Sequence, residues 1–371
     1  MPAEYLHIVS FNVPYPPDYG GVIDIYHKIR ALKDAGIHII LHCFTYGRQP
    51  AKELEKICLR VHYYPRKSGL KYFLSRIPYI VNTRTSKSMP ENLLKDSFPV
   101  LFEGLHSTSM LKKCARANKR VLVRTHNIEH RYYRFLSRSE KNIFRKIFLR
   151  SESNKLFRYE KILHHADQVL GIAKHETAYF HQKYHHALFI PAFHRFDEVV
   201  SLPGSGDYLL FHGNLSVPEN SRAFLYLAET ILSHISIPVI VAGKDPSGKF
   251  IRKTAKYPNV IVIPNPPDEQ MDSLIQNAHI NLLYTAQSTG IKLKLLHALY
   301  AGRYCLVNPP MVEGTGLEHL CHLAGTSEET LKKLDELMKV PFTENQISMR
   351  KKTLSDYSNR VGAEKIIRLL N

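Results

Sequence analysis

The stretch GIKLKLLHALYAGRYCLVNPPMVEGTGLEHL, from Gly290 to Leu320, decides the fold of this chain. Leucines recur at helical spacing between Leu293 and Leu299, and Gly302 then ends the helical pattern. The run from Tyr304 to Val307 is short and apolar, which is typical of a strand buried on both faces. The stretch therefore predicts a helix followed by a buried strand of an α/β fold.

The same stretch predicts an anion site. After the strand comes the loop from Gly314 to Gly316, and we expect a second helix to begin at Leu317. A glycine loop that opens a helix leaves backbone N–H groups unpaired at the positive end of the helix dipole, where a phosphate binds well. Lys294 and His297 lie three positions apart on the preceding helix and so share a face. We expect these side chains and the helix start to converge on one anion.

Working outward, the whole chain has the composition of a globular protein. Its 371 residues suit two domains, and its hydrophobic fraction is 44%. No window approaches eighteen uninterrupted apolar residues, and the apolar run after Glu4 resembles a strand more than a signal peptide. We expect a cytoplasmic protein, at most peripheral on the inner face of the cytoplasmic membrane.

The net charge of +18 favours anionic partners, which include nucleotide sugars, anionic lipid head groups and nucleic acid. No zinc-finger spacing and no RNA-binding aromatic signature accompanies the charge, so we expect no nucleic acid partner. The five cysteines are odd in number, scattered, and never in a Cys-x-x-Cys pair. We expect them to be reduced and structural.

The N-terminal stretch predicts a βαβ unit. A buried strand from His7 to Asn12 leads through a proline-rich loop to Gly20-Gly21, a helix runs to about Lys33, and the next strand spans Ile37 to Cys43. Strand, glycine turn, helix and strand within so short a stretch predict a parallel, helix-covered sheet. The glycine pair would lie at the carboxyl end of the first strand, where ligands bind in such sheets, although a plain turn would also explain it.

A second loop of this half carries catalytic candidates. Two more strands are expected at Phe98 to Glu103 and at Val121 to Arg124, and the latter ends in Thr-His-Asn-Ile-Glu. Because loops at the carboxyl ends of parallel strands carry ligands, His126 and Glu129 would present an imidazole beside a carboxylate. We name both as catalytic, with a structural role for His126 left open.

The βα alternation restarts after residues 201–206, which contain one proline and two glycines and resemble an interdomain linker. We expect an N-terminal Rossmann-like domain at residues 1–200, joined by a final basic helix at 349–371, and a C-terminal Rossmann-like domain at 207–348. The expected strands of the second domain are Tyr208 to His212, Val239 to Ala242, Val260 to Ile263, Ile280 to Tyr284 and Tyr304 to Val307.

Two segments of the first half are both basic and aromatic, at residues 66–87 and 137–165. The second shows apolar residues at the spacing of long amphipathic helices with basic outer faces. Both segments fit a solvated surface. Both also fit a surface that faces a membrane or an acceptor, because basic aromatic helices lie well against anionic lipid.

The opening stretch resembles the donor-sugar segment of GT-B glycosyltransferases of the retaining, sucrose-synthase-like group, a family 4-like pattern of bacterial enzymes. That pattern is a glycine, a basic residue, an apolar residue, Lys, two apolar residues, Glu and Ala. The matching positions here are Gly290, Lys292, Leu293, Lys294, Leu295, Leu296, His297 and Ala298. The group usually carries two glutamates seven positions apart, where this chain has Gly290 and His297.

The resemblance implies two Rossmann-like doubly wound domains that face a cleft, with a C-terminal helix that crosses back to the first domain. It implies transfer of a hexosyl unit from a UDP- or GDP-linked sugar to a glycan or lipid-linked acceptor, as in polysaccharide biosynthesis, with retained configuration. The donor-binding positions would be Gly20, Gly21, Gly213, Asn214, Lys244, Lys292, Lys294, His297, Gly314, Thr315, Gly316 and Leu317. The acceptor side would include Asp18, Tyr19 and Asn127.

We expect no cofactor and no metal, because the chain has no Asp-x-Asp pair to hold a divalent ion on the donor phosphates. Three alternatives stay open. A nucleotide-sugar epimerase can share the fold and would turn over the donor without an acceptor. A non-catalytic nucleotide-sugar-binding protein is allowed by the missing glutamates, and a basic membrane or nucleic-acid adaptor would bind in a salt-sensitive way.

Overall fold

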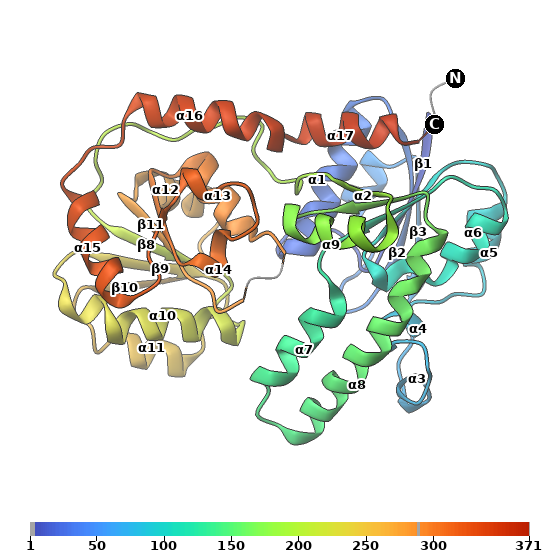
Figure 1. Ribbon diagram of the computed structural model, residues 1–371, viewed down its shortest axis with the longest axis horizontal. Helices are drawn as coiled ribbons and strands as arrows, with labels where there is room; N and C mark the ends of the chain where they lie inside the picture. Colours follow the sequence, from blue (N-terminus) through green and yellow to red (C-terminus); the bar gives the residue numbers. More distant parts are fainter. Residues whose placement is uncertain (1–3, 288–289, 371) are drawn as a thin grey trace. The chain divides into compact units, whose positions relative to one another are not determined.

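The computed structural model describes residues 4–287 and 290–370. The chain divides into two compact units: unit 1 comprises Met1–Arg195 and Tyr357–Asn371, and unit 2 comprises Phe196–Asp356. Each unit is built on one parallel β-sheet with helices packed against it (Figure 1). The predicted α/β architecture with parallel, helix-covered sheets is therefore confirmed.

The sheet of unit 1 has seven strands in the order β3-β2-β1-β4-β5-β6-β7, and every neighbouring pair is parallel. Its strands are β1 Tyr5–Ser10, β2 His38–Thr45, β3 Arg60–Pro65, β4 Val100–Glu103, β5 Val121–Thr125, β6 Gln168–Gly171 and β7 Ala187–Phe189. Side chains alternate between two buried faces: Leu6 and Ile8 pack into one core cluster, and Val9 packs into the other. Burial on both faces explains why these strands read as nearly continuous apolar runs.

The helices of unit 1 follow the βα alternation that the sequence predicts. They are α1 Gly20–Asp34, α2 Lys52–Ile57, α3 Leu70–Phe73, α4 Tyr79–Asn82, α5 Met89–Leu94, α6 Leu111–Arg116, α7 Glu129–Ser139, α8 Ile143–Tyr159, α9 Lys174–Tyr184 and α17 Asn359–Arg368, with 3₁₀ turns at Leu105–Met110 and Glu160–His165. β1, α1 and β2 form the predicted βαβ unit, since β1 pairs with β2 in parallel. The glycine pair forms the first two residues of α1, so it opens the helix rather than only preceding it.

The last helix of unit 1 corrects a sequence prediction. We expected one basic helix over residues 349–371, but the chain forms α16 Glu344–Leu354, a 3₁₀ turn at Ser355–Tyr357, and then α17. The Ser358 side chain accepts a hydrogen bond from the Val361 N–H and so caps a new helix. Ala363 and Ile366 of α17 are buried in the same core cluster as α1, so this helix belongs to unit 1.

The sheet of unit 2 has six parallel strands in the order β10-β9-β8-β11-β12-β13. Its strands are β8 Leu209–His212, β9 Val239–Gly243, β10 Val260–Pro264, β11 Ile280–Leu283, β12 Tyr304–Val307 and β13 His322–Leu323. Its helices are α10 Pro218–Thr230, α11 Gly248–Thr254, α12 Asp268–Asn277, α13 Leu293–Ala301, α14 Pro309–Val312, α15 Ser327–Met338 and α16, with 3₁₀ turns at Leu232–His234 and Glu318–Leu320. The sequence also predicts strands at Val169 to Ala173 and Leu188 to Pro191, which correspond to β6 and β7, but it misses β3 of unit 1 and β13 of unit 2.

Two local predictions in unit 2 are corrected. Residues 201–206, expected as a linker, lie inside the unit, where Gly204 forms an antiparallel bridge with Phe342. The helix expected at Leu317 is only the 3₁₀ turn Glu318–Leu320, because the chain must enter β13 at His322. The loop from Gly314 to Gly316 therefore opens no α-helix, and the dipole argument made for it is wrong.

Candidate functional site

Strand order places a candidate site in each unit. The order reverses between β1 and β4 in unit 1 and between β8 and β11 in unit 2. In open parallel sheets, ligands bind outside the carboxyl ends of the strands at such a reversal. Both regions are rich in buried polar side chains, which we describe in turn.

In unit 1, a closed network of buried charges lies beside this reversal. The Lys28 ammonium lies 2.9 Å from Asp24 Oδ2 and 2.7 Å from Glu103 Oε1. The Arg124 guanidinium donates to both Asp24 oxygens, at 2.9 and 3.3 Å. All four side chains are fully buried. Two anions are thus matched by two cations, the arrangement that buried charges require.

The network holds Asp24 ionised. Burial alone would raise the pKa of this carboxyl, but Arg124 and Lys28 lower it well below its usual range. The Phe193 N–H also donates to Asp24 Oδ1 at 2.8 Å, so the carboxylate ties α1 to the chain after β7. Arg124 in turn donates to the carbonyl oxygens of Ile190 and Pro191.

His126 extends this network towards the carboxyl edge of the sheet. Its Nε2 lies 3.1 Å from Glu103 Oε2, and its ring meets the Phe11 ring edge-on at 5.6 Å. The hydrogen-bond partner of His126 is therefore Glu103 on the neighbouring strand, a residue that the sequence did not single out. Glu129 is the first residue of α7, and its side chain is buried in a separate group.

That separate group contains a carboxyl held neutral. Burial, reinforced by the nearby Glu176, raises the pKa of Glu129 to about 8. Burial likewise lowers the pKa of His106 well below its ordinary value. His106 Nδ1 lies 3.8 Å from Glu129 Oε1, and among the described residues neither atom has a hydrogen-bond partner. Both atoms thus lack, among the described residues, the hydrogen-bond partner that buried polar groups usually have.

Asp24, Glu103 and His126 also place one ligand atom each within 4.8 Å of one another, a spacing that a metal ion could use. Lys28 and Arg124 already neutralise these carboxylates at hydrogen-bond distance. A divalent cation would have to displace or repel both. The donor set therefore fits a structural charge network better than a metal centre.

Phe11 links the start of α1 to His126. The Phe11 ring that contacts His126 also packs against Gly21, where a Cβ atom would lie only 2.7 Å from it. A larger residue at this position would have to displace the Phe11 ring. Tyr19, the N-cap of α1, accepts a hydrogen bond from the Asn12 amide, and Asp18 pairs with Arg48. Asn127 hydrogen-bonds Glu129 and so belongs to the neutral-carboxyl group.

In unit 2, Lys294 occupies the centre of the site. Its Nζ donates to Asn220 Oδ1 and to the Tyr284 carbonyl oxygen, each at 3.3 Å, and lies 5.4 Å from the centre of the Phe211 ring. Asn220 and Tyr284 lie in the segments that follow β8 and β11, the two strands at the reversal, and Phe211 lies in β8 itself. Burial lowers the pKa of Lys294 to about 8, although Glu219 opposes the shift.

The N-terminus of α13 carries two lysines and no acid. Lys292 is the N-cap, Lys294 lies in the first turn, and the first turn has no acidic residue. The N-terminal end of a helix is its positive end and normally favours carboxylates. Two added cations at this end are unfavourable by themselves and become favourable once an anion binds. The helix start that suits an anion is therefore Leu293, not Leu317.

The loop after β8 is shaped by close backbone packing. A Cβ atom on Gly243 would lie 1.8 Å from the Gly213 carbonyl oxygen, so only glycine lets the loops after β8 and β9 approach. The Asn220 amide, which accepts from Lys294, donates to the Asn214 carbonyl oxygen at 2.9 Å. Asn220 thus links the Asn214 backbone to Lys294.

His297 lies one turn after Lys294. Its Nε2 lies 2.7 Å from Asp272 Oδ1, and its ring packs 4.8 Å from the Phe196 ring. Its ring also lies 5.9 Å from that of His212, whose pKa burial lowers well below the ordinary value. His297 therefore lies near Lys294 as predicted, and Asp272 orients its imidazole.

The remaining predicted donor residues lie in two loops, after β9 and after α14. Lys244 is exposed after β9, and its carbonyl oxygen accepts from the Leu215 N–H. Gly314 and Gly316 adopt positive φ angles of 71° and 80° in the loop that follows α14. In the same loop, the Thr315 hydroxyl donates to the Val312 carbonyl oxygen and accepts from the N–H of the buried Leu317.

The sequence did not single out several residues that build these sites. They are Phe11, Asp24, Lys28, Glu103, His106, Arg124 and Glu176 in unit 1, and Phe211, His212, Glu219, Asn220 and Asp272 in unit 2. One usable signal was present: Arg124 interrupts an otherwise apolar strand run, and a charge in a strand that is buried on both faces needs a partner.

Comparisons with known proteins support the fold. No known protein-family model matches the chain. The "uncharacterized 44.6 kDa protein in cps region" of Klebsiella pneumoniae is 28% identical over 345 residues, 87% of this chain and 88% of that protein. Anabaena HepE, solved in complex with UDP and glucose, matches with a TM-score of 0.68 at 10% identity over 99% of each chain. The lipopolysaccharide outer core galactosyltransferase WaaB, solved in apo form, matches with a TM-score of 0.66 at 14% identity over 98% of each chain. The chain thus has the GT-B fold of glycosyltransferases, as its sequence predicts.

Proposed function

We propose that this GT-B chain is a glycosyltransferase that moves a hexosyl unit from a UDP- or GDP-linked sugar to a glycan or lipid-linked acceptor, without a metal ion and with retention of configuration. The observation that carries the proposal is the pair of lysines at the N-terminus of α13, beside the strand-order reversal of unit 2. Such a charge arrangement suits the diphosphate of a nucleotide sugar.

Lys294 and Lys292 would stabilise the negative charge that develops on the departing diphosphate. Stabilisation of developing charge by fixed groups is often the largest contribution to enzymatic rate enhancement. The Gly213-Asn214 loop and the loop from Gly314 to Gly316 would border the nucleotide, and His297 would contact the donor from the next turn of α13. HepE was solved with UDP and glucose, which supports a nucleotide-sugar donor.

In unit 1, His126 and Glu129 would face the transferred sugar and the acceptor hydroxyl. The neutral Glu129 carboxyl can donate a hydrogen bond at neutral pH, as its pKa of about 8 allows. His126, fixed by Glu103, would position the sugar. Asp18, Tyr19 and Asn127 would border the acceptor.

The cps region in the relative's name is consistent with polysaccharide biosynthesis. We propose that this chain acts in the same process in the cytoplasm, at the inner face of the membrane.

A non-catalytic nucleotide-sugar-binding role is the second candidate. The residues that replace the two family glutamates favour it, because Gly290 has no side chain and His297 is engaged by Asp272. A chain that kept the binding site but lost the catalytic groups would bind a nucleotide sugar without converting it. A nucleotide-sugar epimerase would instead convert the donor without any acceptor.

The test is a thermal-shift panel of UDP- and GDP-sugars, followed by transfer assays with each stabilising donor. A ligand at a hundred times its Kd adds about 2.7 kcal/mol of stability, which such a panel resolves readily. We expect stabilisation by one donor class and acceptor-dependent release of the nucleoside diphosphate. Stabilisation without release would select the binding role, and no stabilisation by any member would overturn the proposal.

A variant tests the part played by unit 1. His126→Ala should lower kcat at least about a hundredfold, the size expected for a positioned polar group, and leave the melting temperature nearly unchanged. The fold should tolerate the loss because Lys28 still neutralises Glu103. Unfolding of this variant would instead assign His126 a structural role.

A further inference from the structure

Two basic segments that lie far apart in the sequence form one surface of unit 1. Phe73 of α3 packs against Phe148 of α8, with ring centres 5.0 Å apart. The Lys155 ammonium donates to the Phe73 carbonyl oxygen at 2.6 Å, and the Tyr79 N–H donates to Glu152 at 2.6 Å. We call this surface, made of residues 66–77 and 131–158, the hairpin surface. α7 and α8 run side by side as a hairpin, with α3 next to α8 (Figure 1).

The hairpin surface exposes an unusual number of large apolar side chains. Leu74 is 88% exposed, and Leu70 and Phe144 are each 80% exposed. Ile143, Ile147, Phe157 and Ile77 are also exposed. A single exposed leucine is ordinary, but a cluster of large apolar side chains rimmed by polar groups marks an interaction site.

Cations surround these apolar side chains. Nine Lys or Arg residues and two glutamates lie between Arg131 and Arg158, and residues 66–77 contain no acid. One of the two glutamates, Glu152, is buried and paired with Lys155. The surface that faces solvent is therefore almost purely cationic between the apolar side chains.

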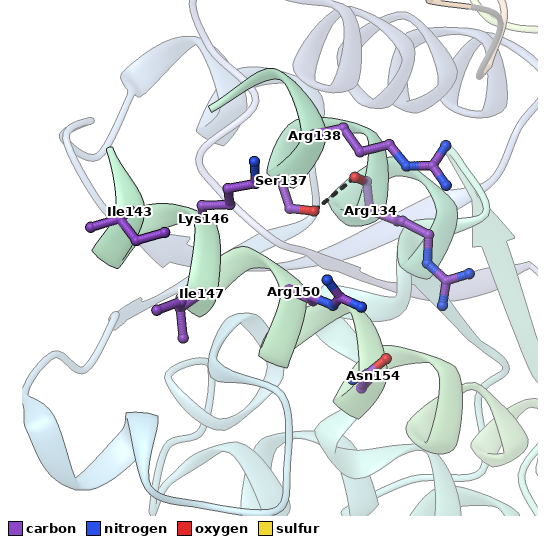
Figure 2. A pocket seen from close by; sticks show the side chains of 8 residues that line it. All are labelled: Arg134, Ser137, Arg138, Ile143, Lys146, Ile147, Arg150 and Asn154. Atoms are coloured by element: carbon purple, nitrogen blue, oxygen red, sulfur yellow. Dashed lines mark hydrogen bonds between the residues drawn. The ribbon is translucent and has the colours of Figure 1, made fainter. Parts of the chain in front are cut away.

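A hollow of about 460 Å³ between α7 and α8 combines both features. Figure 2 shows the basic side chains of Arg134 and Arg138 on one side of the hollow and the apolar side chains of Ile143 and Ile147 on the other. Arg150 and Lys146 complete its cationic lining. The hollow thus offers several guanidinium and ammonium groups next to apolar carbon, which suits a phosphate group attached to a hydrocarbon chain.

We propose that the hairpin surface docks on an anionic lipid bilayer, with Leu74, Phe144 and their apolar neighbours inserted between the lipid head groups and the basic side chains paired with lipid phosphates. Charge complementarity selects this occupant, because a second copy of the chain would bring the same cations against one another. Contact with nucleic acid phosphates would not require large apolar side chains to be exposed. The inference does not depend on the transfer reaction.

The mode of contact is interfacial. No helix among the described residues is both long enough and apolar enough to cross a bilayer. Side chains that reach only the head-group region, combined with basic residues around them, give reversible binding that depends on lipid charge.

The test is co-sedimentation of the full chain with vesicles of phosphatidylcholine alone and with vesicles in which one third of the lipid is phosphatidylglycerol. We expect binding to the anionic vesicles only, and weaker binding as salt is raised. The triple variant Arg138→Gln/Lys146→Gln/Arg150→Gln should bind about a hundredfold more weakly, since each basic residue near an anionic surface contributes about fivefold. Phe144→Ser should weaken binding to the anionic vesicles about tenfold, because it removes an apolar side chain that would be buried in the bilayer.

α11 supplies matched controls in unit 2. Lys249→Gln/Arg252→Gln/Lys253→Gln removes the same charge from an exposed helix, and Ile251→Ser removes an exposed apolar side chain. Neither variant should change vesicle binding. Melting temperatures should stay near that of the unchanged chain for every variant, because all these positions are exposed.

Three results would overturn the proposal. The first is no binding of the unchanged chain to anionic vesicles. The second is an equal loss in the hairpin and α11 charge variants, which would mean that net charge alone acts. The third is a dimer in solution that Phe144→Ser dissociates, or RNA binding that Phe144→Ser abolishes, either of which would assign the surface to another partner.

Discussion

Lys294→Gln is the most informative change in unit 2. Glutamine can still donate to the Asn220 and Tyr284 oxygens that Lys294 contacts. The hydrogen bonds between these segments can therefore be kept, and only the positive charge is lost. A hydrogen bond to a charged group contributes about 1.5–3 kcal/mol, so the affinity for UDP or GDP should fall about tenfold to a hundredfold. Loss of one fixed contact to developing charge should slow transfer by about 10²–10³.

The pH dependence of binding provides a second readout. The pKa of Lys294 is about 8 in the free protein, and a bound diphosphate should raise it. The contribution of the ammonium is therefore fully present below about pH 8, and affinity should fall by up to about tenfold per pH unit above that value. In Lys294→Gln the affinity should not change over the same range.

Isothermal calorimetry with the nucleoside diphosphate, the nucleoside and the matched variant Lys253→Gln measures both effects. The nucleoside should bind equally to all forms, and Lys253→Gln should match the unchanged chain because Lys253 is exposed on α11. Equal diphosphate affinity of Lys294→Gln and the unchanged chain would refute the reasoning. So would the same pH dependence in both.

Four further outcomes are expected. Asp24→Asn should lower the free energy of unfolding by about 3–5 kcal/mol in urea titrations, because the buried Arg124 guanidinium loses its anionic partner. A loss below about 1 kcal/mol would mean that Arg124 does not need this carboxylate for stability. Burial lowers the pKa of His7 from 6.5 to about 4, so stability that is present above pH 6.5 should decline by about 3 kcal/mol as pH falls towards 4. Urea unfolding across this range should show a shallower decline for His7→Gln, and an unchanged slope would exclude His7 as the source. Gly243→Ala should reduce both the melting temperature and diphosphate affinity, because its Cβ would collide with the Gly213 backbone; an unperturbed melting temperature would show that the loops can separate at little cost. Excess chelator should leave transfer intact, and a loss that Mg²⁺ or Mn²⁺ restores would count against the lysine-based leaving-group argument.

Local pattern was sufficient to predict much of the fold. The helix after Lys292 and the strand Tyr304–Val307 were predicted almost to the residue, because leucine periodicity and a glycine stop act within one turn of the chain. The parallel sheets followed from the βα alternation, since two parallel strands need a crossover. The identity of Lys294 as a donor-site residue remains a prediction, as do all the other site roles.

The sequence pattern did not predict features that depend on contacts between residues far apart in the sequence. Asp24 and Arg124 lie 100 positions apart, and only the assembled sheet brings them to 2.9 Å. The imidazole of His126 hydrogen-bonds Glu103 because β4 and β5 are adjacent strands. Glu129 is the first residue of α7, and its side chain is buried elsewhere. The helix expected at Leu317 did not form because too few residues separate that loop from β13. None of these competing contacts is visible in a window of one or two helical turns.

The return of α17 has a consequence for biosynthesis. Its Ala363 and Ile366 complete the core around α1, and the Leu369 carbonyl oxygen accepts a hydrogen bond from Arg120. A nascent chain exposes the apolar surface of α1 until residues 359–370 have emerged from the ribosome. Unit 2 lies between the two parts of unit 1, so it can fold first during translation although it begins later in the sequence. Ribosome stalling before residue 359 would therefore leave an aggregation-prone first domain beside a finished second one.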